Sequence, residues 1–471
     1  MKKHILWGMF ILFLLTAVIV GMMNHFKKLP NNLSYAGDVH KTDDIEFLYD
    51  LTYKDKFDEI KVEQQIFSEA WKVIDEAEDF ILIDMFLFND YTDQDRDFPD
   101  LSGQLTEKLV AKRKSHPNMP IVFITDPINT GYHSYESDQL QTLEENNIEV
   151  VLTELDPLHD SNKAYTSVWR ILVKPFGNGK SGWLPNPFAS EAPKLSLRSY
   201  LTLFNVKANH RKAIVSEKNA IIQSANAHNE SGFASNIGFK VSGNVIRDIV
   251  EAEQAIIDYS GGQTKIEPPK ELPESGDITV QYLTEGEILE NLVLSIDETG
   301  SGDTVWVGMF YIANRSIINA LENASSRGVD IRLILDANVN AFGNHKAGLP
   351  NIPIANELNG NDNITIRWYE SGEDQFHTKL LFIQKEAESI IIGGSANHTT
   401  RNLNDLNLEN NVKIVAPNNS QLSTDVEQYF ERLWMNKAGQ FTSDYETNEG
   451  ALTPMLKLTY WVQKMTGLTT Y

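Results

Sequence analysis

Two short stretches of the chain place a histidine two residues before a lysine, and an apolar run follows each lysine. They occupy residues 209–217 and 376–384. Residues i and i+2 of a β-strand point to the same face, so each imidazole should lie beside a permanent cation. One such pair is a weak signal. Two pairs, at matching places in two halves of one chain, indicate a duplicated active site.

The four side chains of these stretches, His210, Lys212, His377 and Lys379, suit the cleavage of a phosphodiester if they act as one site. The lysines can hold the non-bridging oxygens and stabilise charge on five-coordinate phosphorus. One neutral imidazole can attack phosphorus and form a phosphohistidine. The other, protonated, can give its proton to the leaving alkoxide and later take one from water or an alcohol. Because the lysines do the electrophilic work, this scheme requires no metal and no cofactor.

Two polar segments follow the paired motifs at matching distances. Ser224 and Asn226 follow the first motif, and Ser395 and Asn397 follow the second. Asparagine amides are suited to donate hydrogen bonds to a phosphate. We therefore predict that these four residues contact the substrate.

A carboxylate at Glu409 could orient one of the histidines, because a nucleophilic imidazole works better when its other nitrogen is held. The equivalent first-half position is Asn236, which cannot supply charge. This asymmetry predicts that the two histidines are not interchangeable. Since Glu409 belongs to the second half, it favours His377 as the nucleophile. The alternative for Glu409 is a surface position at the start of a strand.

The elements that position these residues follow a βαβ rhythm, which predicts a largely parallel sheet covered by helices. In the first half we expect strands at 45–52, 80–87 and 121–126, and helices at 62–77, 101–113 and 246–259. In the second half, 304–311, 331–336 and 390–397 repeat the strand pattern. One module appears twice, and packing about a pseudo-twofold axis would bring the two histidines face to face. Asp126 and Asp336, at strand ends, are expected to cap loops.

Residues 156–203 interrupt this rhythm in the first half only, with a long irregular segment rich in proline, glycine and aromatic residues. Long irregular segments inside a domain are usually functional loops. Two interpretations stay open here. The segment is either a surface excursion packed on its own aromatic side chains, or a lip that shapes the substrate entrance or touches lipid.

Composition narrows the classes of partner. The chain has 471 residues, a formal net charge of -24 and no cysteine. Disulfides, thiolate chemistry and cysteine-based zinc sites are excluded. The negative charge disfavours a polyanion held by a broad basic surface, so we expect no nucleic acid partner. A small phosphodiester held by a few local cations remains compatible with this charge.

The N-terminus carries an apolar run at residues 5–23, with lysines on both sides. As a helix it would span about 28 Å, close to the hydrocarbon thickness of a bilayer. No small-x-small cleavage site follows, so residues 1–28 are predicted to be an uncleaved single-pass anchor. The acidic, cysteine-free remainder favours an extracytoplasmic catalytic part on a bacterial plasma membrane.

The remaining boundaries follow from proline and glycine content and from helical spacing. We predict a tether at 29–44, a first domain at 45–260, a linker at 261–277, a second domain at 278–440 and a tail at 441–471. The tail has apolar residues near helical spacing. It could pack on the second domain or lie on lipid as an amphipathic helix.

At these residues the chain resembles the phospholipase D superfamily, whose signature is H-x-K-x-x-x-x-D twice per chain, each followed by a G-G/S-x-N type segment. The resemblance covers about residues 45–437. It implies an α-β-α sandwich for each half and a shared site between them. It also implies phosphatidyl transfer to water or an alcohol through a phosphohistidine, as in a phospholipase D or cardiolipin synthase-like enzyme. Family habit assigns His210 as the nucleophile, and the partners implied are a phospholipid and a membrane surface.

The chain departs from the family pattern at the motif aspartate, which is Glu217 in the first half and Gln384 in the second. Gln223 stands where glycine would be usual. The family aspartate supports motif geometry more than bond making, so these changes leave the nucleophile, the acid and the phosphate cations in place. They still motivate an alternative function, a catalytically weakened lipid-binding protein. A nuclease of the same superfamily is the remaining alternative, and oligomeric state is not predicted.

Overall fold

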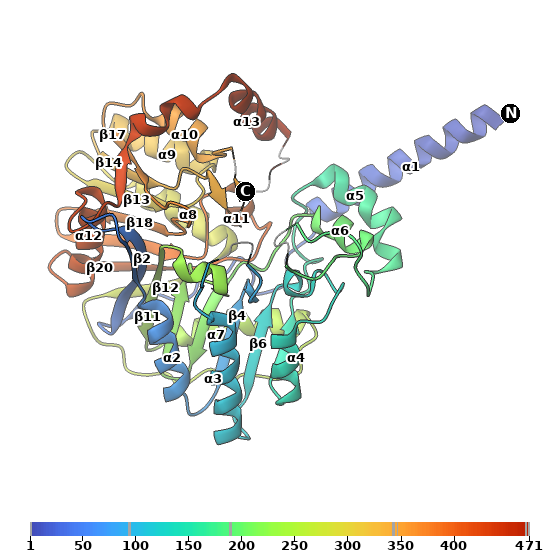
Figure 1. Cartoon of the computed structure of the whole chain (residues 1–471), viewed down its shortest axis with the longest axis horizontal. Helices are drawn as coiled ribbons and strands as arrows, with labels where there is room; N and C mark the ends of the chain where they lie inside the picture. The colour runs from blue at the N-terminus through green and yellow to red at the C-terminus, as the bar shows by residue number, and fades with distance from the viewer. Residues whose placement is uncertain are drawn as a thin grey trace.

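The computed structural model describes residues 2–92, 96–187, 191–341, 344–345, 347–466 and 469. Two large mixed sheets lie side by side, each with helices on its outer face, and a long helix projects from one end (Figure 1). This arrangement confirms the predicted pair of related α-β-α sandwiches with an N-terminal apolar helix.

The strands of the two sheets follow the same order, within the described residues. The first sheet runs β3 (Ile60–Glu63), β2 (Ile45–Lys54), β11 (Asn236–Ser242), β9 (Asn219–Gln223), β8 (Lys212–Ser216), β4 (Ile81–Met85), β6 (Ile121–Thr125) and β7 (Glu149–Leu152). The second runs β1 (His40–Lys41), β12 (Thr279–Thr284), β20 (Asn410–Pro417), β19 (Glu388–Gly394), β18 (Lys379–Gln384), β13 (Thr304–Met309), β14 (Asp330–Leu335), β17 (Ile364–Tyr369) and β21 (Thr442–Asp444). From β2 and from β12 onwards, seven successive strands correspond. The internal duplication is therefore present in the topology as well as in the motifs.

The expectation of largely parallel sheets is wrong. In the first sheet only β4, β6 and β7 pair in parallel, whereas β8, β9, β11 and β2 pair antiparallel. The reason is the short connection between β8 and β9, residues 217–218, because such a connection allows only a hairpin. The second sheet repeats this arrangement, with residues 385–387 between β18 and β19.

The helices divide into outer and inner layers. In the first half, α2 (Ile66–Glu76), α3 (Leu101–Ser115) and α4 (Asp138–Glu145) pack on the outer face of their sheet. In the second half, α8 (Glu285–Asp297), α9 (Arg315–Ser326) and α10 (Asn351–Leu358) do the same. The helix expected at 62–77 begins only at Ile66, because residues 60–63 pair with β2 as an edge strand.

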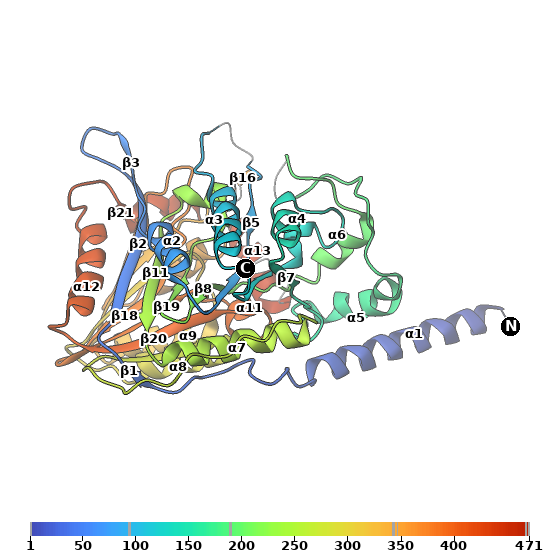
Figure 2. The ribbon, with the colours of Figure 1, turned by 90° about the horizontal axis from the view of Figure 1, so that it is seen from below.

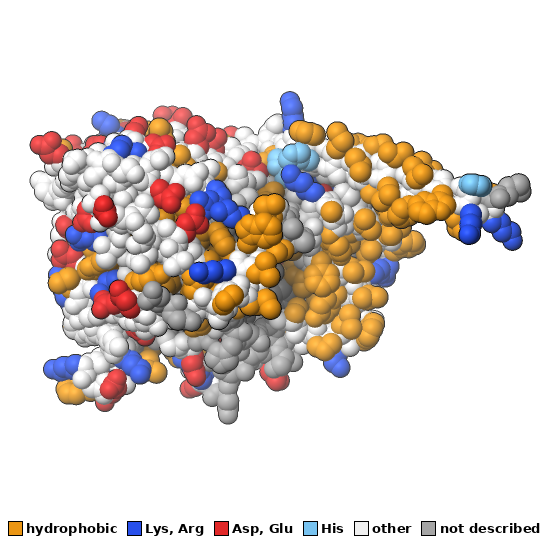
Figure 3. All heavy atoms as spheres, turned by 90° about the horizontal axis from the view of Figure 1, so that it is seen from above, with side chains coloured by type: hydrophobic (Ala, Val, Ile, Leu, Met, Phe, Trp, Pro, Cys, Tyr) orange, Lys and Arg blue, Asp and Glu red, His pale blue; other side chains and the backbone are white. Residues whose placement is uncertain are grey.

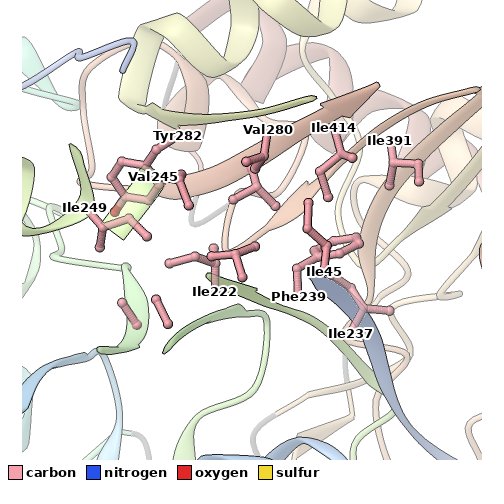
Figure 4. Packing of buried hydrophobic residues seen from close by; sticks show 14 of the residues in the cluster. Ile45, Ile222, Ile237, Phe239, Val245, Ile249, Val280, Tyr282, Ile391 and Ile414 are labelled. Atoms are coloured by element: carbon pink, nitrogen blue, oxygen red, sulfur yellow. The ribbon is translucent and has the colours of Figure 1, made fainter. Parts of the chain in front are cut away.

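A shared hydrophobic core joins the two halves. Ile222, Ile237 and Phe239 of the first sheet face Ile391 and Ile414 of the second across this core (Figure 4). Two helices, α7 (Val245–Tyr259) and α12 (Gln421–Trp434), contribute their buried faces to it. The halves thus pack through their sheets as one body, which fixes the relative position of residues at the facing strand ends.

The N-terminal helix α1 (Lys2–His25) is the one helix, among the described residues, that is long and apolar enough to cross a membrane. The predicted tether after it does not hang free. Residues 29–44 run along one edge of the body, the lower edge in Figure 2, where β1 pairs with β12 and Leu33 is buried. Residues 261–277, all described, contain no helix or strand, as expected of a linker.

The segment at 156–203 is less irregular than its sequence suggests. It forms two helices, α5 (Lys163–Leu172) and α6 (Leu197–Leu203), and α5 lies against α1. In the tail, α13 (Pro454–Thr466) packs on the second half through buried Leu456, while Met455, Trp461 and Met465 remain exposed.

Candidate active site

Two backbone bridges bring the paired motifs together. Asn209, just before the first site histidine, pairs with Leu408, and Phe376, just before the second, pairs with Ser235. Asn209 and Phe376 occupy equivalent places in the two halves, and so do Leu408 and Ser235. The two bridges are therefore pseudo-twofold mates, and they deliver both histidines to the same seam between the sheets.

A cavity of about 380 Å³ opens at this seam, and both histidines line it. Asn226 and Asn397 line it as well, so their contact with substrate stays a prediction. Much of the remaining wall is aromatic or aliphatic and comes from both halves: Phe86, Leu87, Ile128, Leu203, Phe204, Val206, Phe310 and Tyr311. Polar and charged side chains, among them Glu230, Asp374 and Arg401, make up the rest of the wall.

Both site lysines are fully buried and held in the same way. Nζ of Lys212 donates to the carbonyl oxygen of His210 at 2.8 Å, and Nζ of Lys379 donates to that of His377 at 2.7 Å. Lys212 also lies 5.1 Å from the ring centre of Phe86. The second lysine lies 5.3 Å from the ring of Phe310. These contacts leave two donors of each ammonium group for another acceptor.

The phenylalanines beside the lysines are site residues that the sequence analysis did not identify. Phe86 packs edge-on against His210, with 4.7 Å between ring centres, and Phe310 packs likewise against His377 at 5.1 Å. The signal was available, because the internal repeat already aligns the strand ending near Phe86 with the strand ending near Phe310.

Glu409 holds the histidine of the other half, which corrects the expectation that it serves His377. Nδ1 of His210 lies 2.8 Å from one carboxylate oxygen of Glu409 and 2.9 Å from the other. Asn402 and Ser395 also donate to this carboxylate. With Nδ1–H pointing at Glu409, the lone pair of His210 Nε2 is free for chemistry.

Asn236 takes the equivalent place beside His377, with Oδ1 at 3.0 Å from the imidazole Nδ1. Ser224 donates to this same Oδ1 at 3.0 Å, and the Asn236 amide donates to the carbonyl of Ala234. The amide oxygen is therefore an acceptor, so Nδ1 of His377 carries the proton that it donates to Asn236. Nε2 of His377 then points away from Asn236, as Nε2 of His210 points away from Glu409. As the sequence predicts, one of the two histidines is held by a carboxylate and the other by a neutral amide. The histidine held by the carboxylate is His210, however, and not His377.

The two serines do not contact the cavity, which corrects their predicted role as substrate ligands. The Ser224 hydroxyl lies between Asn236 and the backbone N–H of Ile237, and that of Ser395 lies between Glu409 and the N–H of Asn410. Both serines are buried behind the histidines. They position the orienting side chains.

Burial and mutual repulsion shape the acid–base properties of the site. Burial first, then the two lysines, lowers the pKa of both His210 and His377 well below the usual histidine value. Burial lowers the pKa of Lys212 to about 7 and raises that of Glu409 to about 8. A bound anion would reverse the effect on the cations, because it favours their protonated forms.

Comparison with known proteins identifies the family of the second half. Residues 277–434 match the family model described as "Cardiolipin synthase, PLD-like domain". The first half repeats the strand order and the histidine–lysine pair of that domain. The second half is thus similar to a PLD-like domain of the cardiolipin synthase type.

One solved structure matches the fold over nearly the whole chain. The crystal structure of phosphatidylserine synthase from Haemophilus influenzae Rd KW20 has a TM-score of 0.54 and 13% identity, covering 95% of this chain and 97% of that one. Polyphosphate kinase from Porphyromonas gingivalis has a TM-score of 0.44 and 12% identity, and the match covers 83% of this chain and 47% of that one. Nuc, a phospholipase D family member from Salmonella typhimurium, has a TM-score of 0.27 and 18% identity, and the match covers 35% of this chain and 97% of that one. A sequence comparison with curated proteins gave no match.

The departures from the phospholipase D signature lie away from the cavity. The Glu217 carboxylate accepts the backbone N–H groups of Glu78 at 2.9 Å and Asp79 at 3.1 Å, at the turn before β4. Gln384 ends β18, and neither side chain lines the cavity. Gln223 is buried, and its amide donates to the carbonyl of Ala225 at 3.3 Å.

Buried carboxylates fix the backbone beside each motif. Asp126 accepts the N–H of Asn209 at 2.7 Å, and Asp336 accepts that of Phe376 at 2.8 Å. Each also accepts an N–H within its own loop, which fits the predicted capping role. Burial raises the pKa of each to about 7. Among the described residues, no three His, Asp or Glu side chains converge as a metal site would require.

A buried ion network ties the two halves together behind the site. Arg211, between the first His and Lys, lies 3.1 Å from a carboxylate oxygen of Glu253 in α7 and 2.8 Å from one of Glu285 in α8. All three side chains are completely buried. Glu285 also accepts the backbone N–H of Glu409 at 3.0 Å. The network therefore connects the contact between the halves to the residue that orients His210.

Proposed function

We propose that this protein is a membrane-anchored phosphodiesterase or phosphatidyltransferase of the phospholipase D type, acting on glycerophospholipids. The observation that carries the proposal is the composition of the cavity wall. Two imidazoles line a cavity in which aromatic and aliphatic side chains alternate with polar ones. Two buried ammonium groups lie 5.1 and 5.3 Å from the ring centres of the wall residues Phe86 and Phe310. Such a site matches a molecule with one anionic phosphodiester and long apolar chains.

In the first step, Nε2 of His210 attacks phosphorus while Glu409 holds Nδ1–H. A new P–N bond forms, and the P–O bond to the headgroup alcohol breaks with its electron pair on oxygen. His377, as the imidazolium, donates its proton to that oxygen. The products are a phosphatidyl-histidine and a free alcohol.

In the second step, water or a second alcohol attacks the phosphatidyl group. Its proton goes to the neutral His377, a new P–O bond forms, and the P–N bond breaks with its electron pair returning to the His210 imidazole. Water gives phosphatidic acid, and an alcohol gives a new phospholipid. The choice between them depends on the acceptor that reaches the site.

Lys212 and Lys379 hold the non-bridging oxygens through both steps, where their charge offsets the negative charge gathered on five-coordinate phosphorus. Asn226 and Asn397 complete the cradle from the cavity wall. The side-chain NH₂ of each asparagine is the group that can donate a hydrogen bond to a non-bridging oxygen. Binding of the phosphodiester anion raises the pKa of His377 and supplies the protonated acid that the first step needs.

Two observations favour this function over the alternatives. Glu217 and Gln384 lie outside the cavity, so the altered motif positions give little support to a catalytically inactive lipid-binding protein. The net charge of -24 counts against a nuclease. The apolar helix α1 favours a substrate within a membrane, and the acidic, cysteine-free body favours the extracytoplasmic side of a bacterial plasma membrane.

The test uses the full-length protein in vesicles that contain phosphatidylglycerol and phosphatidylcholine, with and without ethanol. Phosphatidylethanol would demonstrate transfer, and phosphatidic acid would demonstrate hydrolysis. His210→Ala serves as the matched inactive control. Lipid that binds without turnover would contradict the proposal and favour a binding protein, and nicked DNA without lipid turnover would favour a nuclease.

A further inference from the structure

The segment between β7 and β8 that carries α5 and α6 has no counterpart of similar size in the second half, where residues 370–378 alone join β17 to β18. We call residues 156–207 the insertion. Five of its residues line the catalytic cavity: Pro187, Leu203, Phe204, Val206 and Lys207. The insertion therefore forms one lip of the cavity mouth, and what it touches decides where substrate enters.

The insertion packs along the apolar helix. One face of α1 is partly covered, and its residues recur at helical spacing: Phe13, Ala17, Val20, Gly21 and Asn24. A Cβ atom added at Gly21 would lie 2.7 Å from the Ser167 hydroxyl of α5, so the two helices approach closely there. Phe13 to Asn24 covers about 17 Å of helix axis. If α1 crosses a bilayer, α5 lies at the depth of the leaflet next to the body.

The end of α1 is also tied to the insertion. The Lys27 carbonyl accepts from Nε2 of His159 at 3.0 Å, and the Lys27 ammonium donates to the carbonyl of Asp156. Anchor and insertion are consequently held in one orientation. In both ribbon views α5 lies beside α1 (Figures 1 and 2).

The outward face of the insertion is apolar and basic. Five of its large apolar side chains are at least half exposed: Leu172, Phe176, Trp183, Leu197 and Phe204. Apolar side chains cover α1 and the adjoining flank in the space-filling view (Figure 3). The insertion contains seven Lys and Arg but three Asp and Glu, a formal charge of +4 in a chain of -24. Exposed Lys163, Lys180 and Lys194 contribute to that charge.

We infer that the insertion is a docking surface for an anionic phospholipid bilayer. Its apolar side chains enter the boundary between headgroups and acyl chains beside α1, and its lysines pair with anionic headgroups. The cavity mouth then faces the same leaflet, so lipid enters it without crossing water. This last step rests on the proposed function, whereas the docking itself does not.

The chain contains no cysteine, so a fluorophore can be attached at a single introduced cysteine to measure how deeply that position lies in the bilayer. Three variants of the full-length chain each carry one cysteine, in place of Phe176, Trp183 or Phe57. Each cysteine is labelled with an environment-sensitive fluorophore, and the protein is studied in nanodiscs that contain phosphatidylglycerol. Phe57 is the matched control, because it is 71% exposed against 69% for Phe176 and lies in the β2–β3 hairpin at the other end of the molecule (Figure 2). Lipid-borne nitroxides should quench positions 176 and 183 at least about twofold more than position 57.

Equal access of a water-soluble quencher to all three positions would overturn the docking surface. Shielding at 176 and 183 without quenching by lipid would also overturn it, because a second copy of the chain or another protein would then cover the face. Neither outcome depends on catalysis.

A second variant tests lipid entry. It combines three substitutions on the outward face of the insertion, Leu172→Glu, Phe176→Glu and Trp183→Glu. None of these residues lines the cavity, so the catalytic groups are unchanged. Turnover of bilayer phosphatidylglycerol should fall about tenfold or more, with turnover of a water-soluble short-chain phosphatidylglycerol kept within about twofold. Equal turnover of bilayer lipid by variant and wild type would overturn entry from the leaflet. If the wild type turned over neither substrate, the proposed function would fail, while the fluorescence result would still decide docking.

Discussion

The carboxylate of Glu409, in the second half, lies 2.8 Å from Nδ1 of His210, in the first. Asn236, in the first half, holds His377 of the second in the same way at 3.0 Å. Each half therefore supplies the orienting group for the other half's imidazole. Neither half contains a complete histidine unit by itself, so the duplicated modules form one site that depends on their packing.

Replacing Glu409 should impair the nucleophile more than any other change outside the histidines and lysines. In Glu409→Gln the amide can present its N–H to His210 Nδ1 and favour the wrong tautomer. We expect kcat to fall by about 10² to 10⁴-fold, as for other carboxylates that orient a catalytic histidine. Steady-state kinetics on vesicles measures this, with circular dichroism to confirm folding. A loss below threefold would show that Glu409 does not orient the nucleophile.

Asn236→Asp is the companion change on the acid side. A carboxylate beside His377 should raise the pKa of that imidazole, because an adjacent negative charge favours its protonated form. The alkaline limb of the kcat profile should therefore move to higher pH. An unchanged profile would contradict the assignment of His377 as the acid.

The pH dependence of kcat/KM should report the buried ammonium groups of the free enzyme. Lys212 has a pKa lowered to about 7 by burial, so it carries its charge below that pH and loses it above. Phosphodiester binding needs the charge, so kcat/KM should fall as pH rises through about 7. Lys212→Arg, which stays protonated, should shift that fall to higher pH. A wild-type kcat/KM that still rose between about pH 7 and 9 would contradict this reasoning.

Arg211 should be essential for stability. Arg211→Met leaves Glu253 and Glu285 buried without their cation, and breaking a buried ion pair from one side costs about 3–5 kcal/mol. Thermal unfolding in detergent micelles should show a lower Tm than wild type. Lys218→Met, which removes a surface ion pair with Glu78, is the control and should leave Tm unchanged. Adding Glu253→Gln and Glu285→Gln should restore part of the loss.

Glu217 should matter to local folding but not to chemistry. It lies five strand residues beyond Lys212, about 17 Å away along the chain. Glu217→Ala removes two backbone hydrogen bonds at the turn before β4, so Tm should fall while kcat/KM stays within about twofold of wild type. Glu217→Asp, which restores the family residue, should not raise activity. A tenfold gain for Glu217→Asp would show that the altered motif limits catalysis.

The sequence predicts the duplication, the shared seam and the side chains that reach the cavity, because paired motifs in matching frames constrain where strand ends meet. The two histidines and the two asparagines line this cavity, and the lysines are buried beside the phenylalanines of its wall. It does not predict which half orients which histidine. Glu409 and His210 are brought together by pairing of Leu408 with Asn209, a contact between distant strands that no local pattern encodes.

The misassigned elements have similar causes. The sequence does not predict strand direction, because a buried apolar run has the same pattern in parallel and antiparallel sheets. It predicts an irregular insertion because the helices α5 and α6 are short and proline and glycine are frequent between them. It predicts that Ser224 and Ser395 contact substrate because one residue separates each from an asparagine that lines the cavity.

The most direct test of the central claim is to trap the covalent intermediate in His377→Ala. This variant keeps the nucleophile and lacks the proton donor, so a substrate with a good leaving group should load it with phosphorus. Mass spectrometry should find one modified residue, His210, bonded through Nε2, and none in His210→Ala. Phosphorus on His377 of the wild type, or on both histidines at once, would contradict a single shared site with His210 as its nucleophile.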